Sequence, residues 1–205
     1  MRLNWLETKL MNNPVRAAAQ RHLEVPRLLR MGGRMNGGRA LEVGCGRGVG
    51  TELILETFGA DHVDAFDLDP AMVALARRRL ARFGDAVRVS TGDVCQIDAS
   101  DASYDAVFDF GIIHHVPNWR DAIAEIFRVL APGGRLYAEE IFGRFTGHPI
   151  TRRLLEHPEA GRFDHDAFRR ALEERGFRVE GSKDVLGLGG FFVAVKERAP
   201  AAAHV

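Results

Sequence analysis

The chain has 205 residues with 28 Lys or Arg and 28 Asp or Glu, so its formal net charge is zero. This balance argues against a globally basic nucleic-acid binder, and we expect no nucleic-acid partner. Two cysteines, Cys45 and Cys95, are too few for a disulfide framework, which favours a reducing, cytoplasmic location. A hydrophobic content of 46% fits one soluble globular domain, and we expect neither a signal peptide nor a transmembrane segment.

Residues 1–37 are predicted to form an N-terminal helical cap. Asn13 followed by Pro14 is typical of a helix start, and Pro26 should interrupt that helix. The apolar stripe expected on it comprises Val15, Ala18, Ala19, His22 and Leu23. The cap either covers the sheet or lies over a ligand cleft, and Trp5 leaves weak contact with a membrane surface as a third alternative.

The segment RALEVGCGRGVG, residues 39–50, organises the rest of the chain. A short apolar run stops at Gly44, Gly46 and Gly48, and helical spacing begins at Val49. Glycine suits such a turn because it accepts positive φ and has no Cβ to keep a ligand from the backbone. We therefore predict a strand, a tight turn and a helix, with the turn facing a ligand cleft at the strand end.

The glycine spacing indicates which ligand this turn binds. A dinucleotide fingerprint, G-x-G-x-x-G, fails because Val49 or Thr51 stands at its last position. The carboxylate of Glu42 would repel a pyrophosphate and attract an ammonium group. With these features, EVGCGRG resembles motif I of the class I S-adenosylmethionine-dependent methyltransferases. Their cofactor carries an amino acid and a sulfonium but no phosphate.

A second predicted strand ends at Asp67 in the string AFDLDP. The interval from Gly48 to Asp67 matches the distance of about 20 residues at which an acid meets a ribose hydroxyl in doubly wound nucleotide sites. Asp69 precedes Pro70, which is typical of a helix cap. We assign the ribose role to Asp67 and the cap to Asp69.

The third and fourth predicted strands end at two further segments of the cleft. Gly92 and Asp93 follow the third strand, where the resemblance implies that the acid accepts a hydrogen bond from the adenine amino group. Phe110 and Gly111 follow the fourth, where the family passes beside the methionine part of the cofactor. The resemblance implies a cofactor site formed by Glu42, Gly44, Cys45, Gly46, Gly48, Asp67, Leu68, Gly92, Asp93, Val94, Phe110, Gly111 and His115.

Two residues are candidates for catalysis. His115 could accept a proton from a nucleophile, because an unperturbed histidine titrates near neutral pH, or it could only anchor its turn through the backbone. Glu139 and Glu140 end the fifth strand and should point to opposite faces, so only one should reach a substrate. We name Glu140 as that candidate, with a salt bridge to an arginine as the alternative.

Residues 142–162 form an insertion without a strand pattern, which the resemblance implies is a substrate lid. Its His148 and His157 have no standard ligand spacing, and we predict no metal site. Residues 199–205 are expected to be a disordered tail. The string FRVLAPGGRLY is similar to the quinone-biosynthesis type of methyltransferase, and the whole resemblance spans residues 38–196.

Alternating β and α segments predict an α/β domain over residues 38–198, a doubly wound Rossmann-like sheet with helices on both faces. The predicted strands are 40–43, 62–66, 87–89, 106–108, 135–141, 177–185 and 191–196. The resemblance implies seven strands, mostly parallel, with the last one antiparallel.

The resemblance also implies S-adenosylmethionine-dependent transfer of a methyl group to an O, N or C nucleophile. The expected acceptor is a small or lipophilic molecule, and the expected assembly is a monomer or homodimer. Two alternatives stay open at this point. One is a nucleotide-dependent oxidoreductase, which the glycine spacing and Glu42 disfavour. The other is a non-catalytic S-adenosylmethionine-binding partner subunit.

Overall fold

The computed structural model describes residues 13–142 and 163–198. The predicted lid, the tail and the contact through Trp5 lie outside these residues. Seven strands form a single sheet: β1 (Arg39–Val43), β2 (His62–Asp67), β3 (Val87–Thr91), β4 (Tyr104–Phe110), β5 (Leu130–Ile141), β6 (Phe177–Val185) and β7 (Gly189–Lys196). Every strand predicted from the sequence is present, and each predicted range lies within the observed one.

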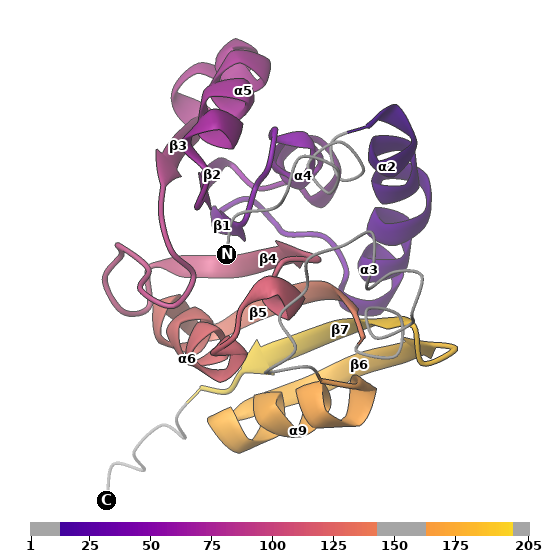
Figure 1. Cartoon of the computed structure of the whole chain (residues 1–205). Helices are drawn as coiled ribbons and strands as arrows, with labels where there is room; N and C mark the ends of the chain where they lie inside the picture. Colours follow the sequence, from indigo (N-terminus) through magenta and orange to yellow (C-terminus); the bar gives the residue numbers. More distant parts are fainter. Residues whose placement is uncertain (1–12, 143–162, 199–205) are drawn as a thin grey trace, which may run out of the picture.

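The strand order is β3-β2-β1-β4-β5-β7-β6, and only β7 runs antiparallel to its neighbours (Figure 1). Chain order reverses between β1 and β4, which pair in parallel with Val43 beside Asp109. A cleft at the carboxyl ends of strands is expected at such a reversal. The doubly wound fold predicted from the sequence is therefore confirmed.

Helices cover both faces of the sheet (Figure 1). One face carries α3 (Val25–Gly32), α4 (Val49–Leu53), η2 (Ile54–Phe58), α5 (Pro70–Leu80) and η3 (Ala81–Ala86). The other carries α6 (Trp119–Val129) and α9 (His165–Arg175). Within β1, Ala40 is buried against α3 and α4, whereas Leu41 belongs to the cluster with α6 and α9. This alternation follows from the two-residue period of a strand.

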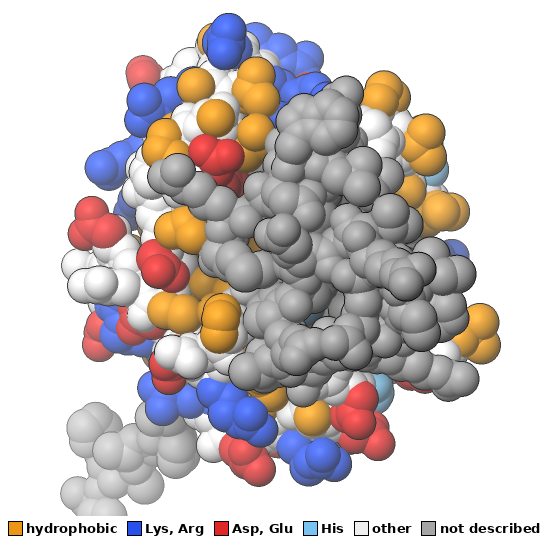
Figure 2. Space-filling view, viewed as in Figure 1, with side chains coloured by type: hydrophobic (Ala, Val, Ile, Leu, Met, Phe, Trp, Pro, Cys, Tyr) orange, Lys and Arg blue, Asp and Glu red, His pale blue; other side chains and the backbone are white. Residues whose placement is uncertain are grey.

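Local capping signals of the sequence form as predicted. Asp69 accepts a hydrogen bond from the Ala71 amide at the start of α5. Gly59 and Gly176 close their helices in the left-handed conformation, with φ of 84° and 107°. Figure 2 shows the Lys and Arg side chains that gather at the edge of the molecule over α5, whose last turn holds three arginines.

The N-terminal helix departs from its prediction in two ways. Pro26 does not end it, because helical structure continues from α2 (Pro14–Ala19) through a π-helical turn, η1 (Gln20–Glu24), into α3. The predicted apolar stripe also faces the wrong way, since Val15 is 78% and Leu23 63% exposed. Gln20 is buried instead. The cause is that the covered face of α2 lies over an open cavity rather than a packed apolar core.

Within the described ranges, no helix is long and apolar enough to span a membrane.

Lys196, at the end of β7, hydrogen-bonds to the carboxyl end of α6. Its Nζ donates to the carbonyls of Phe127 and Leu130, each at 2.7 Å, at the carboxyl end of α6. A cation at this position satisfies carbonyls that have no partner within the helix.

Candidate active site

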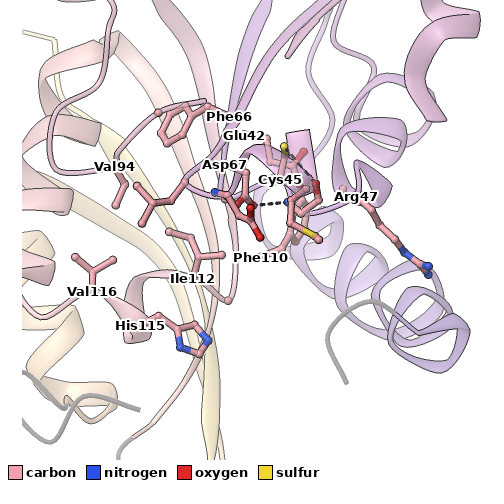
Figure 3. Close-up of a pocket in the computed structure, with 18 of the residues that line it drawn as sticks. Glu42, Cys45, Arg47, Phe66, Asp67, Val94, Phe110, Ile112, His115 and Val116 are labelled. Atoms are coloured by element: carbon pink, nitrogen blue, oxygen red, sulfur yellow. Dashed lines mark hydrogen bonds between the residues drawn. The ribbon is translucent and has the colours of Figure 1, made fainter. Parts of the chain in front are cut away.

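A cavity of about 390 Å³ opens where β1, β2 and β4 end, and α2 and η1 cover one side of it. Figure 3 shows Glu42, Cys45, Asp67 and Phe110 gathered at the glycine turn, with His115 on a separate segment across the cavity. All the predicted cofactor residues line this cavity except Gly48. The structure therefore brings together segments that lie up to seventy residues apart in the sequence.

The glycine turn has the backbone that only glycine adopts easily. Gly44, Gly46 and Gly48 have φ of 66°, 51° and 83°. A Cβ at Gly44 would lie 2.5 Å from the side chain of Ile112, so the turn packs closely against the segment after β4. Gly48 serves a different purpose, because a Cβ there would lie 2.8 Å from Leu80 of α5. Gly48 thus starts α4 and lets it pack, and it does not line the cavity.

Asp67 fixes the turn from the neighbouring strand. Its Oδ2 accepts a hydrogen bond from the Gly46 amide at 2.8 Å, and its Oδ1 accepts one from the Asp69 amide at 2.9 Å (Figure 3). Burial raises the pKa of this carboxyl, and both hydrogen bonds oppose that shift. The carboxylate still lines the cavity and has lone pairs for a further donor.

Glu42 is buried beneath the turn and lines the cavity at 2% exposure. The hydroxyl of Thr51 donates to its carboxyl group. Burial raises the pKa of Glu42 to about 8, so the group carries a proton at neutral pH in the free protein. A cationic ligand beside it would favour the charged form, which fits the predicted attraction for an ammonium group.

The segment after β3 forms another wall of the cavity. Gly92, Asp93 and Val94 line the cavity, and Phe66 of β2 lines it beside them. Asp93 Oδ1 accepts a hydrogen bond from the Cys95 amide at 2.9 Å, which fixes the turn. An aromatic ring, a valine and a carboxylate together suit a flat heterocycle with an amino group.

Beyond β4 the chain passes the cavity and enters a short 3-10 turn, η4 (Ile113–His115). Gly111 has a φ of 82°, and a Cβ there would lie 3.2 Å from Glu139 Oε2. Phe110, Gly111 and His115 all line the cavity. His115 is the titratable side chain that η4 brings to it.

Glu140 does not lie where the catalytic prediction placed it. It is fully buried and does not line the cavity. Its two oxygens accept hydrogen bonds from the amides of Ile113 at 2.7 Å and His114 at 3.1 Å. The Nδ1 of His114 lies 2.6 Å from the same carboxyl group. Glu140 therefore holds η4 from below, which corrects the expectation that it contacts a substrate.

Asp109 strengthens the same support, because its Oδ1 accepts a hydrogen bond from the Ile112 amide at 3.0 Å. Burial raises the pKa of Asp109 well above its usual range, and the pKa of Glu140 to about 8. Burial lowers the pKa of His114 to about 3, so its imidazole is neutral. The support under η4 is thus a set of buried, largely neutral polar groups.

The side of the cavity facing the glycine turn comes from the N-terminal helix. Arg16 and Gln20 line it, with Ala17 between them. Arg16 donates to Glu24 at 2.6 Å and lies 3.3 Å from Glu139, so Glu24 is its nearest ion-pair partner. Sequence analysis missed these residues, because the apolar pattern of α2 indicated the opposite face as buried.

Comparisons with known proteins show that the chain is similar to methyltransferases. A family model described as a methyltransferase domain matches residues 40–134. The chain is 33% identical over 159 residues to an S-adenosylmethionine-dependent methyltransferase of Mycolicibacterium smegmatis, covering 78% of this chain and 58% of that protein. It is 36% identical over 118 residues to the malonyl-[acyl-carrier protein] O-methyltransferase of Serratia marcescens, covering 58% of this chain and 44% of that protein.

Solved structures share the fold. A chain from the complex between the Haloferax volcanii Trm112 methyltransferase activator and a methyltransferase superposes with a TM-score of 0.76 at 19% identity, covering 97% of this chain and 100% of that chain. A SAM-dependent methyltransferase from Aquifex aeolicus gives a TM-score of 0.72 at 19% identity, covering 95% and 100%. The chain spans about half the length of the two curated relatives described above.

Proposed function

We infer that this chain, which belongs to the class I S-adenosylmethionine-dependent methyltransferases, transfers the methyl group of that cofactor to a small or lipophilic acceptor. The observation that carries this proposal is the convergence of the glycine turn, Asp67, Asp93 and His115 on one cavity. The cavity volume of about 390 Å³ is within the range of small-molecule sites.

The residues present fit the cofactor. Asp67 would accept hydrogen bonds from the ribose hydroxyls, and Asp93 would accept one from the adenine amino group. Glu42, held by Thr51 under the turn, would face the ammonium group. When bound, the cofactor supplies a methyl group that its sulfonium already activates. The chain then has to orient the acceptor for in-line attack and to exclude water.

The acceptor class is inferred from relatives and from the cavity wall. The similar proteins include methyltransferases named for malonyl-[acyl-carrier protein], phthiotriol dimycocerosates and demethylmenaquinone. Near His115 the wall is largely apolar, with Ile112, Val116 and Pro117. An apolar wall beside one titratable side chain suits a lipophilic acceptor with a single polar reacting atom.

Calorimetric titration tests the cofactor, and a transfer assay tests the reaction. We expect S-adenosylmethionine and S-adenosylhomocysteine to bind and NADH not to bind. Radiolabelled methyl groups should then reach at least one member of a panel of phenols, quinones, fatty acids and amines. Preferential binding of NADH would overturn the proposal in favour of an oxidoreductase. Binding without transfer to a panel that a related methyltransferase accepts would favour a non-catalytic partner subunit.

His115 is proposed as the proton acceptor for an acceptor whose nucleophile is protonated. We expect His115→Ala to lower kcat by about 100-fold, the lower end of the usual range for a general base, while the Kd of S-adenosylmethionine changes little. His62→Ala, outside the cavity on β2, is the matched control. A weaker cofactor affinity with kcat preserved would show that His115 only anchors its turn.

A further inference from the structure

Gln20 is a buried amide that faces the cavity without a protein partner. It is 7% exposed and lines the cavity from η1. Among residues 13–142 and 163–198, none makes a hydrogen bond to its side chain. Its amide atoms are not sealed in the protein interior, so they open into the cavity. The side chain therefore has donor and acceptor capacity for a molecule inside the cavity.

Neighbouring contacts place Gln20 at one end of the cavity. One turn earlier, Arg16 lies 3.4 Å from the Phe110 carbonyl at the end of β4. One residue later, Arg21 lies 3.8 Å from Glu52 of α4. Gln20 lies between these two contacts, so it faces the region where the glycine turn ends and α4 begins.

The local helix geometry supports a role for this residue. Gln20 is the first residue of the π-helical turn, and its carbonyl accepts a hydrogen bond from the Val25 amide. Proline has no amide hydrogen, so Pro26 requires a change in the helical hydrogen-bond pattern just before it. Single π-helical turns within α-helices are frequently found at functional sites.

The charges around Gln20 limit what it can bind. Arg16 already has Glu24 as its nearest ion-pair partner. Arg47 also lines the cavity, but its side chain points away from the other labelled residues in Figure 3. The proposed cofactor ends in an α-amino acid. Asp67 and Asp93, which we assign to its ribose and adenine, cannot donate a hydrogen bond to a carboxylate while they are ionised.

We propose that the side-chain amide of Gln20 donates a hydrogen bond to the α-carboxylate of the bound cofactor. The N-terminal helix then completes the cofactor site at its amino-acid end, with Arg16 as the adjacent cation. This inference rests on the proposed function, since it presupposes a sulfonium nucleoside with an amino-acid tail.

Two ligands that differ only at that tail test the proposal. S-adenosylhomocysteine carries the amino acid, whereas 5′-methylthioadenosine keeps the nucleoside and thioether and lacks it. We expect Gln20→Leu to raise the calorimetric Kd of S-adenosylhomocysteine about tenfold and to leave that of methylthioadenosine unchanged. Gln20→Glu should raise the first Kd further, because a carboxylate there would repel the ligand carboxylate. His22→Leu, exposed on the same turn, should change neither.

Three results would overturn the inference. An equal loss for both ligands would show general damage to the site. If Gln20→Leu left the Kd of both ligands unchanged but altered the KM of a methyl acceptor, Gln20 would contact the methyl acceptor and not the cofactor. Tighter binding of S-adenosylhomocysteine by Gln20→Glu would place the amide beside the ligand ammonium. If the unaltered chain binds neither ligand, the proposed function itself fails, which is a separate outcome.

Discussion

The two sides of the cavity are built by different means. The side at the glycine turn is made of strand ends, positive-φ glycines and Asp67, all within thirty residues of the chain. The opposite side joins the N-terminal helix to η4, which buried Glu140 supports through contacts between distant segments. The first side carries the residues that we propose for the cofactor. The second side is where this chain can differ, so its acceptor preference should depend on it.

The largest expected effect is a fall in the free energy of unfolding when Glu140, which holds η4, is removed. Glu140→Ala removes the acceptor of the Ile113 and His114 amides and the partner of the His114 ring. Each buried donor left without a partner costs about 1 to 3 kcal/mol, so the free energy of unfolding should fall by about 3 kcal/mol or more. Urea unfolding measures it, with Glu180→Ala on β6 as the control. A loss below 1 kcal/mol would contradict the proposed support.

The next expected effect is on the glycine-turn side. Asp67→Ala removes the proposed ribose acceptor and the acceptor of the Gly46 and Asp69 amides. The Kd of S-adenosylhomocysteine should rise by about 10- to 100-fold, which corresponds to about 1.4 to 2.7 kcal/mol. Asp61→Ala, which removes the acceptor of the Gly38 amide outside the cavity, should leave that Kd within about twofold. Unchanged affinity in folded Asp67→Ala would refute the ribose assignment.

The pH dependence of stability compares the two sides directly. Burial raises the pKa of Glu42 on one side and of Glu140 on the other to about 8, from 4.5. Between these values the folded chain holds protons that the unfolded chain releases, so stability should fall as pH rises from about 4.5 to 8. The pKa of His114, lowered from 6.5 to about 3, makes stability fall as pH drops below about 6.5.

Two glutamates outweigh one histidine above pH 4.5, so thermal unfolding of the free protein at pH 4.5 to 9 should show the highest Tm at about pH 4.5 and a decline from there to pH 8. Glu42→Gln removes one titrating group and should flatten the alkaline decline, as should Glu140→Gln. If Glu140→Gln flattened the alkaline decline of Tm and Glu42→Gln did not, Glu42 would not hold a proton in the free protein at neutral pH. A Tm that rises steadily to pH 9 would contradict both assignments.

The smallest expected effect separates stability from binding, because Lys196 lies on neither side of the cavity. Lys196→Met should lower the free energy of unfolding by about 1 kcal/mol, since the last carbonyls of α6 lose a charged donor. The Kd of S-adenosylhomocysteine should stay unchanged. Lys183→Met, on the exposed edge strand β6, is the control and should leave both values unchanged. A weakened ligand affinity in Lys196→Met would mean that α6 and the cavity are coupled.

Most of the fold could be predicted from the sequence because its signals are local. Asp69 before Pro70 and Gly59 after η2 act within a few residues, and apolar runs marked every strand. The cofactor side of the cavity was predicted for the same reason. The glycine spacing and the distance to Asp67 are properties of a continuous stretch of chain.

The opposite side could not be predicted, because its contacts are not local. Glu140 ends a strand as expected, but its partners at η4 lie 26 residues or more earlier in the chain. Apolar periodicity assigned the wrong face of α2 as buried, since it assumes an apolar core beneath a helix. Here Arg16 and Gln20 lie on the covered face instead, over an open cavity. Gly48 was placed in the cavity because a backbone turn does not reveal which glycine packs against Leu80.

The proton held by Glu42 has a consequence for calorimetry. An incoming ammonium group that meets this carboxyl would displace its proton, and the buffer would take that proton up. The heat measured on binding would then include the ionisation enthalpy of the buffer, so titrations in Tris and in phosphate at one pH would differ in heat and agree in affinity.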